Sequence, residues 1–258
     1  MTERLNMQIT EAELSAMTTQ MDQMHRASLP ALHDHVGRVV ESNREQLARP
    51  VGRRGVLIGG LTLAGAGALA ACGSSKKTPP VATSSSAAGA TYTGDLKVVA
   101  LAAALENLAV AAYGMALTAA QAGTYGAVPP AIASFVTTAK DHHTQHAAAW
   151  NAVLASAGKP TVTTPALSIT NDQVAMLKAA KTLPDVAKLA LGLETAAAQT
   201  YTFATSAVND INGVQVAATI APVEAQHAAI LAFVLGQYPA PDAFLKVTNA
   251  VPASAFTG

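Results

Sequence analysis

The sequence predicts an all-α protein, a four-helix bundle that follows an N-terminal export segment. The first observation is that the chain beyond residue 93 consists of long Ala-rich stretches, with Pro at their starts and Gly after their ends, as helices prefer. The second is that 50% of the residues are hydrophobic but only 4% are aromatic, so small side chains fill the core and let helices approach closely. The third is a residue pattern that occurs in two successive pairs of these stretches.

Residues 1–52 form an N-terminal extension that is far longer than the charged start of an ordinary signal peptide. Two explanations stay open: translation starts at a later methionine, or residues 9–47 form an amphipathic cytosolic helix with a purpose of its own. The methionines are Met7, Met17, Met21 and Met24. We interpret the histidines of the extension as solvated, because no carboxylate lies at a useful spacing. These histidines are His25, His33 and His35.

Residues 53–72 have the three parts of a signal peptide: a positive flank, a short apolar core and small residues before the end. Arg53-Arg54, followed by Gly, Val and Leu, resembles a twin-arginine signal, and the closing Leu-Ala-Ala-Cys72 resembles a bacterial lipobox. The lipobox implies that Cys72 is lipid-modified, becomes the mature N-terminus and tethers the protein to the outer face of the cytoplasmic membrane, in the cell envelope. An uncleaved membrane anchor and a simple cleaved signal are the alternatives.

Residues 73–92 are rich in Gly, Ser, Pro and Thr, so we expect a flexible linker that holds a folded domain away from the membrane. The net charge is zero and no basic patch stands out, which argues against nucleic-acid binding. The lone cysteine excludes an intrachain disulfide and any zinc or iron–sulfur site built from several cysteines.

The folded domain is expected over residues 93–236, followed by a tail, residues 237–258, that packs on the bundle. Its four long helices are predicted at residues 95–121, 130–157, 184–208 and 213–235. A Thr/Pro-rich connection joins the second helix to the third and contains a short helix, residues 171–181, capped by Asn171. This long crossover between helices two and three favours two helix pairs over four short hairpins. Pro222 should kink the fourth helix or mark its start.

The two helix pairs share a pattern. The first and third helices each carry Leu-Glu with a Tyr seven residues after the Glu, so that Glu and Tyr share a face. These pairs are Glu106 with Tyr113 and Glu194 with Tyr201. The second and fourth helices each carry Gln-His-Ala-Ala, at His146 and His227, and their alignment places His143 opposite Glu224. We interpret both tyrosines, and Trp150, as core residues rather than parts of a site.

Beyond Cys72 the chain contains only three Glu and four His, and most of them occupy this pattern. Glu224 and His227 are three residues apart, so they lie one turn apart on one helix face and can hold the same ion. His143 and His146 have the same spacing. The predicted metal ligands are Glu106, His143, His146, Glu194, Glu224 and His227. Mixed carboxylate and imidazole ligands suit iron, manganese or zinc rather than soft copper.

With these motifs the chain resembles the ferritin-like domain proteins, particularly their exported bacterial branch, over residues 95–236. The resemblance implies a four-helix bundle with a di-iron or di-manganese centre. Glu106 and Glu194 would be the single-helix ligands, and Glu224–His227 and His143–His146 the paired ones. The departure is His143, where the family's pattern has Glu. Imidazole binds one ion end-on, so this change weakens the prediction of two carboxylate-bridged ions.

Two functions follow from the sequence. The first is an exported, membrane-tethered metalloprotein that binds one or two iron or manganese ions, with zinc less favoured, and oxidises ferrous iron or consumes peroxide. The second is a metal-free structural or stress-protective lipoprotein in which Glu–His contacts replace the metal. An iron-storage cage is a poor third, because a tethered N-terminus hinders closure of a shell. The expected partner is the membrane; a homodimer is compatible with the sequence, and no protein partner is indicated.

Overall fold

The computed structural model describes residues 5, 7–48, 92–241 and 245–258. Over these ranges the chain is helical apart from connections and one isolated β-bridge, which confirms the all-α prediction. The predicted signal with Cys72 and most of the predicted linker lie outside the described residues, so export and lipidation stay predictions.

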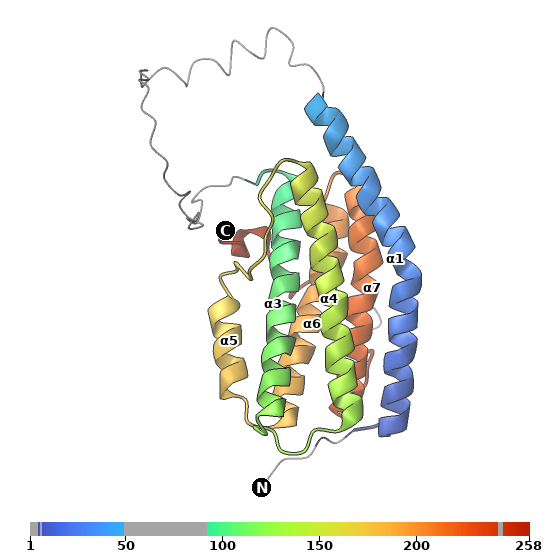
Figure 1. Cartoon of the computed structure of the whole chain (residues 1–258), viewed down its shortest axis with the longest axis vertical. Helices are drawn as coiled ribbons and strands as arrows, with labels where there is room; N and C mark the ends of the chain where they lie inside the picture. Colours follow the sequence, from blue (N-terminus) through green and yellow to red (C-terminus); the bar gives the residue numbers. More distant parts are fainter. Residues whose placement is uncertain (1–4, 6, 49–91, 242–244) are drawn as a thin grey trace, which may run out of the picture.

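Four long helices form the bundle (Figure 1). They are α3 (Asp95–Gln121), α4 (Pro130–Ser156), α6 (Leu183–Ala207) and α7 (Ile211–Val234). Helix α3 packs closely along α4, and α6 packs along α7, which gives the two predicted pairs. The starts follow from local sequence: Pro130 occupies the first turn of α4, and Thr182 and Asp185 form a capping box on α6. Helix α7 begins at Ile211 and continues through Pro222, so this proline does not mark its start.

The crossover from α4 to α6 contains the short helix α5 (Thr170–Ala179), which packs on α3 and α6. Its N-cap is Ile169, without a side-chain hydrogen bond, so the prediction of a cap at Asn171 was wrong. Asn151 of α4 holds the crossover through both of its amide atoms, accepting from Val162 N at 2.7 Å and donating to Val162 O at 2.9 Å. The crossover thereby places the two helix pairs side by side, with α3 against α6.

A fifth long helix, α1 (Glu11–Ala48), lies along α4 and α7 (Figure 1). It runs antiparallel to α7: the Gln8 side-chain amide donates to Gly236 O at 2.8 Å near one end, and Arg38 Nε donates to Asn212 Oδ1 at 2.9 Å toward the other. Leu14 and Leu32 on its inner face are 0% and 2% exposed. The described part of the N-terminal extension is therefore packed against the ferritin-like bundle that the sequence predicted.

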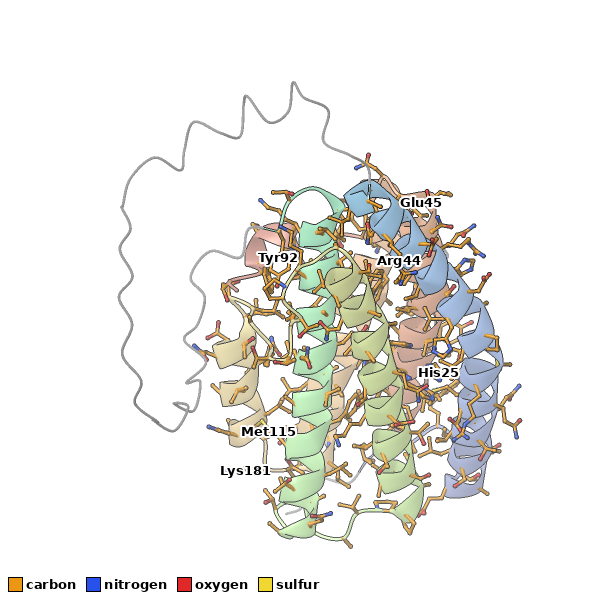
Figure 2. All side chains as sticks on the ribbon, turned by 45° about the horizontal axis from the view of Figure 1, so that its top comes forward. His25, Arg44, Glu45, Tyr92, Met115 and Lys181 are labelled. Atoms are coloured by element: carbon orange, nitrogen blue, oxygen red, sulfur yellow. The ribbon has the colours of Figure 1, made fainter. Side chains whose placement is uncertain are left out.

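This packing corrects one interpretation of the sequence. His25 lies on the side of α1 that faces the bundle (Figure 2). It is 2% exposed and its ring contacts His142 and His146 of α4, so the prediction that it is solvated was wrong. His33 on the outer face of α1 is exposed, and His35 is partly exposed beside Arg38. The sequence of α1 alone could not separate these cases, because the partners of His25 lie far along the chain.

The core consists of two apolar clusters on either side of a polar layer. Along α4, Phe135 belongs to one cluster and Trp150 and Leu154 to the other, and His143 lies between them. Small residues such as Ala103 in α3 are fully buried, which lets the helices approach closely. Helices α3 and α7 are long and apolar enough to resemble membrane spans, but much of each is buried inside the bundle.

The C-terminal segment runs over the outside of α6. Backbone amides of Asn249 and Val251 donate to the side chains of Gln199 at 2.7 Å and Thr200 at 2.8 Å. Phe256 pairs with Leu167 of the crossover in a single antiparallel bridge. This segment therefore ties the crossover to the third helix of the bundle.

The packing of α1 predicts a stability effect. Replacing Leu32, which lies in the larger apolar cluster, with Ala should lower the free energy of unfolding by about 2–4 kcal/mol, because it leaves a cavity between α1 and the bundle. Denaturant unfolding monitored by circular dichroism measures the change. Leu47→Ala, at a position 67% exposed, is the control and should cost less than about 0.5 kcal/mol. Equal effects of the two changes would show that α1 does not pack as described.

Candidate metal centre

The polar layer between the two clusters contains all six residues that the sequence predicted as metal ligands. Each of the four bundle helices contributes, and each of the six side chains is no more than 2% exposed. They are Glu106 on α3, His143 and His146 on α4, Glu194 on α6, and Glu224 and His227 on α7. The structure therefore brings together six residues that span more than a hundred positions of sequence, while their role as ligands stays a prediction.

The six side chains form two overlapping groups, within each of which one potential ligand atom per residue lies within 4.8 Å of the others. The first group is Glu106, His143, His146 and Glu224. The second is His143, Glu194, Glu224 and His227. Glu224 and His143 belong to both groups. The geometry thus offers two adjacent positions for a cation, with one carboxylate common to both.

Glu224 is the strongest indication of a bound cation. Its Oε1 lies 3.0 Å from His146 Nδ1 and its Oε2 lies 3.5 Å from His227 Nδ1, on opposite sides of the carboxylate. Neither oxygen has a hydrogen-bond partner among the described residues, nor has His146 Nδ1, although all three atoms are buried. His146 and His227 are close enough to pair electrostatically with Glu224 but form no hydrogen bond with it, and a buried carboxylate without hydrogen bonds is destabilising. An ion between these atoms would satisfy them, so the residues present fit a metal such as iron or manganese.

His143 supports a different arrangement. Its Nδ1 lies 2.7 Å from Glu106 Oε2 and its Nε2 lies 3.1 Å from Glu194 Oε1, so a protonated ring donates to both carboxylates. Burial lowers the pKa of His143, but the nearby Glu224 and Glu194 carboxylates outweigh this and raise the pKa well above its ordinary range. An imidazolium at this position supplies positive charge to the carboxylates without any metal. This is the contact that the metal-free hypothesis requires.

In His146 and Glu106 of the centre, neighbouring groups of opposite charge also outweigh the effect of burial on the pKa. Burial opposes the charged form of His146, yet Glu106 and Glu224 raise its pKa to about 9. The Glu106 carboxylate is disfavoured by burial, but His146 and His143 lower its pKa to about 2. Carboxylates and imidazoliums therefore balance one another in the metal-free protein. A metal ion that enters must displace protons from the histidines, which couples binding to pH.

The family model of the ferritin-like domain matches residues 94–237, which include all five helices from α3 to α7 and all six predicted ligands. The chain belongs to the ferritin-like family. Comparisons with curated proteins and with solved structures gave no match. The family explains the bundle and the four-helix origin of the centre, and α1 lies outside the matched residues.

Two tyrosines join the carboxylates of the ferritin-like centre in a crossed arrangement. Tyr113 on α3 donates its hydroxyl to Glu194 on α6, and Tyr201 on α6 donates to Glu106 on α3. The prediction that these tyrosines only pack in the core was therefore wrong, although both are buried. Trp150 is buried as predicted, and it also donates to the Tyr201 hydroxyl at 2.9 Å. The crossed pairs follow the internal repeat, because each half supplies the tyrosine that binds the other half's glutamate.

Three residues near the centre are not among the six predicted ligands: Asp22, His25 and His142. His142 Nδ1 lies 3.1 Å from His227 Nε2, and His142 Nε2 lies 3.3 Å from Asp22 Oδ1. Burial and the neighbouring histidines lower the pKa of His25 to about 3 and that of His142 to about 4, so both rings stay neutral at pH 7. No local signal in the sequence marks these residues, because the contacts of Asp22 and His25 depend on the docking of α1 and the contact of His142 with His227 joins α4 to α7.

An apolar cavity reaches the ferritin-like centre from the side of α3, α5 and α6. Its lining includes Glu106, His143 and Glu194 of the centre, together with Leu177 of α5 and Val186 of α6. The lining is mainly aliphatic. An apolar cavity of this kind suits a small, weakly polar molecule better than a large charged one.

The metal-free protein should be most stable near pH 6.5. His146, with a folded pKa of about 9 against an ordinary 6.5, contributes stability that is fully present below pH 6.5 and is lost as the pH rises through about 9. His25 and His142, with folded pKa values of about 3 and 4, contribute stability that is present above pH 6.5 and is lost as the pH falls. Urea unfolding at intervals from pH 4 to pH 9, in the presence of a chelator, measures both effects.

The control for this pH profile is the same series with His33→Ala, which removes an exposed histidine of α1 and should leave the profile unchanged. Each pKa unit corresponds to about 1.4 kcal/mol, so both limbs should be readily measurable. A metal that replaces the protons should also flatten the alkaline limb. A profile that is flat from pH 5 to pH 9 in the chelated protein would contradict the charge assignment.

Proposed function

We propose that this protein is an exported, membrane-tethered ferritin-like metalloprotein that binds one or two iron or manganese ions in the bundle core, with zinc less favoured. The observation that carries the proposal is the buried carboxylate of Glu224, whose oxygens face His146 and His227 without hydrogen-bond partners among the described residues. Mixed carboxylate and imidazole donors are the ligands these ions prefer. All six candidate ligands are buried and belong to the two overlapping groups that could hold a metal ion.

The proposed chemistry is the oxidation of ferrous iron or the consumption of peroxide. Bound iron or manganese would supply the redox change. The hydroxyl of Tyr113 would hold Glu194 in place, and that of Tyr201 would hold Glu106. The apolar clusters on either side would keep bulk water away from the carboxylates. The apolar cavity lined by Glu106, His143 and Glu194 would give a small oxidant a place beside the centre. An oxidative-stress role in the cell envelope follows from this chemistry and from the proposed export.

A metal-free structural or stress-protective lipoprotein is the second candidate. The position of His143 favours it, since one imidazolium can donate to Glu106 and Glu194 at 2.7 and 3.1 Å. In this case the centre is a buried ion-pair network that fixes the packing of the four helices. Removing one partner of such a network is strongly destabilising, because it leaves an uncompensated buried charge.

Metal content separates the two candidates. The full chain, purified without added chelator, should contain iron or manganese near one or two ions per chain, and added Fe²⁺ or Mn²⁺ should raise its melting temperature. At a free metal concentration a hundred times the Kd, the stabilisation is about 2.7 kcal/mol. Glu224→Ala should abolish both the bound metal and the rise in melting temperature.

The matched control is Asp172→Ala, which removes an exposed carboxylate in the first turn of α5 and should leave metal content unchanged. Measuring the melting temperature of each metal-free variant separates loss of metal from loss of fold. Sub-stoichiometric metal in the wild type, together with no thermal response to Fe²⁺, Mn²⁺ or Zn²⁺, would refute the metalloprotein and favour the structural candidate.

The proposed export raises the question of whether α1 stays with the exported domain. Cleavage before Cys72 would separate α1 from the bundle that it packs against, because α1 precedes the signal-like residues 53–72. The twin-arginine route carries folded proteins, so it is compatible with a bundle that forms around its metal in the cytosol. Whether α1 stays with the exported domain is then decided by its non-covalent contacts.

The mass of the protein extracted from membranes tests this part of the proposal. Lipidation predicts a chain that begins at Cys72 and carries the added mass of a lipid, and Cys72→Ser should release the protein from the lipid-anchored fraction. The control is Ser75→Ala, three residues later, which should change neither mass processing nor fractionation. A mature chain that retains residues 1–71 would refute lipidation at Cys72.

A further inference from the structure

Helix α1 contacts the candidate metal centre through two polar side chains as well as through its apolar face. His25 Nε2 lies 3.2 Å from His146 Nε2, and Asp22 Oδ1 lies 3.3 Å from His142 Nε2. The rings of His25 and His142 are stacked, with centroids 3.7 Å apart and an interplanar angle of 18°. At this point along α1, its polar side chains therefore meet the histidines of α4.

The two outer histidines approach the ligand histidines from the side away from the carboxylates. His146 directs Nδ1 toward Glu224 Oε1 at 3.0 Å, and its Nε2 meets His25. His227 directs Nδ1 toward Glu194 Oε2 at 3.2 Å, and its Nε2 lies 3.1 Å from His142 Nδ1. In both cases Nδ1 is the atom available to an ion, and Nε2 is left to donate a hydrogen bond outward.

This arrangement assigns the hydrogens. If Nδ1 of a ligand histidine binds an ion, its Nε2 carries the proton and needs an acceptor. His25 Nε2 accepts from His146, and His142 Nδ1 accepts from His227. His142 must then carry its own proton on Nε2, which donates to Asp22 Oδ1. Asp22 is in turn held by Arg26, whose Nε lies 2.9 Å from Asp22 Oδ2.

We propose that α1 is a fifth functional helix of the metal centre, in which Asp22, through His142, and His25 act as positioning residues that fix the tautomer and ring orientation of His227 and His146. This inference rests on the proposed metal-binding function and extends it to a helix outside the matched ferritin-like domain. Outer hydrogen-bond partners of ligand histidines typically change metal affinity 10–100-fold when they are removed. The metal affinity of this protein therefore depends on a segment that precedes the domain.

Asp22 provides the cleanest test, because its side chain is 27% exposed and its replacement leaves no buried cavity. The probe is Co²⁺, whose visible absorption reports ligand geometry, titrated into the full chain. Asp22→Ala should raise the Kd for Co²⁺ by about 10–100-fold and change the absorption spectrum. Asp22→Asn keeps an oxygen that accepts from His142 and should restore most of the affinity and the wild-type spectrum.

Asp34→Ala is the matched control. Asp34 lies on the same helix and, like Asp22, pairs with an arginine four residues later, but it faces solvent rather than the centre. This variant should bind Co²⁺ as the wild type does. The metal-free melting temperatures of Asp22→Ala and Asp34→Ala should be similar, which shows that a difference in Kd does not arise from a general loss of α1 packing.

Two failures are distinguishable. If the wild type binds Co²⁺ and Asp22→Ala binds it with the same Kd and spectrum, α1 only packs on the bundle and the inference is overturned while the metal centre stands. If the wild type binds no Co²⁺, the proposed function falls and the inference falls with it. His25→Phe, which keeps an aromatic ring of similar size without an acceptor, should weaken Co²⁺ binding and alter its spectrum, whereas unchanged binding would remove His25 from the proposal.

Discussion

Three glutamates are buried in the middle of an apolar helical bundle, and the rest of the structure accommodates the charge that they bring. A carboxylate without partners in such surroundings costs several kcal/mol, so each one needs a cation, a protonated imidazole or a hydroxyl. Glu106 and Glu194 receive both a tyrosine hydroxyl and a nitrogen of His143. Glu224 receives no hydrogen bond from the described residues, and the His146 and His227 rings, at 3.0 and 3.5 Å, offset its charge where the two candidate ligand groups overlap. This difference is the physical basis for the proposed metal.

The internal repeat explains both the regularity of the centre and its departure from the family's pattern. Each helix pair supplies a glutamate, a tyrosine and a histidine in equivalent positions, and the tyrosines cross to the glutamate of the other pair. The repeat breaks at one place, where His143 stands opposite Glu224. That replacement removes one negative charge and adds a ring that can donate to two carboxylates at once. His143 thus reduces the negative charge that bound cations would have to balance. When protonated, it also supplies one positive charge itself.

Helix α1 covers the outer surface of α4 and α7 and also contacts histidines beside the candidate metal centre. It buries leucines like any packed helix, but it also places neutral His25 and the carboxylate of Asp22 behind the ligand histidines. Because α1 precedes the signal-like segment, the proposed export and the proposed metal binding would be linked: a step that separates α1 from the domain would also remove the groups proposed to orient His146 and His227. In this proposal, the metal affinity of the centre would depend on whether the metal binds before or after processing separates α1 from the domain.

The sequence by itself determined the four long helices, their pairing and the six candidate ligands. It could do so because helix ends are marked by local Pro and Gly, and because Glu224 and His227, or His143 and His146, show their common face in a spacing of three. The tertiary structure decided the burial of His25, the partners of His142 and the crossed tyrosine pairs. His25 and His146 are 121 residues apart, and no periodicity connects them. The contacts of His25 and Asp22 exist only once α1 has docked. The tyrosine pairs exist only once α3 and α6 pack together, and the energies of all these contacts depend on burial that no local pattern encodes.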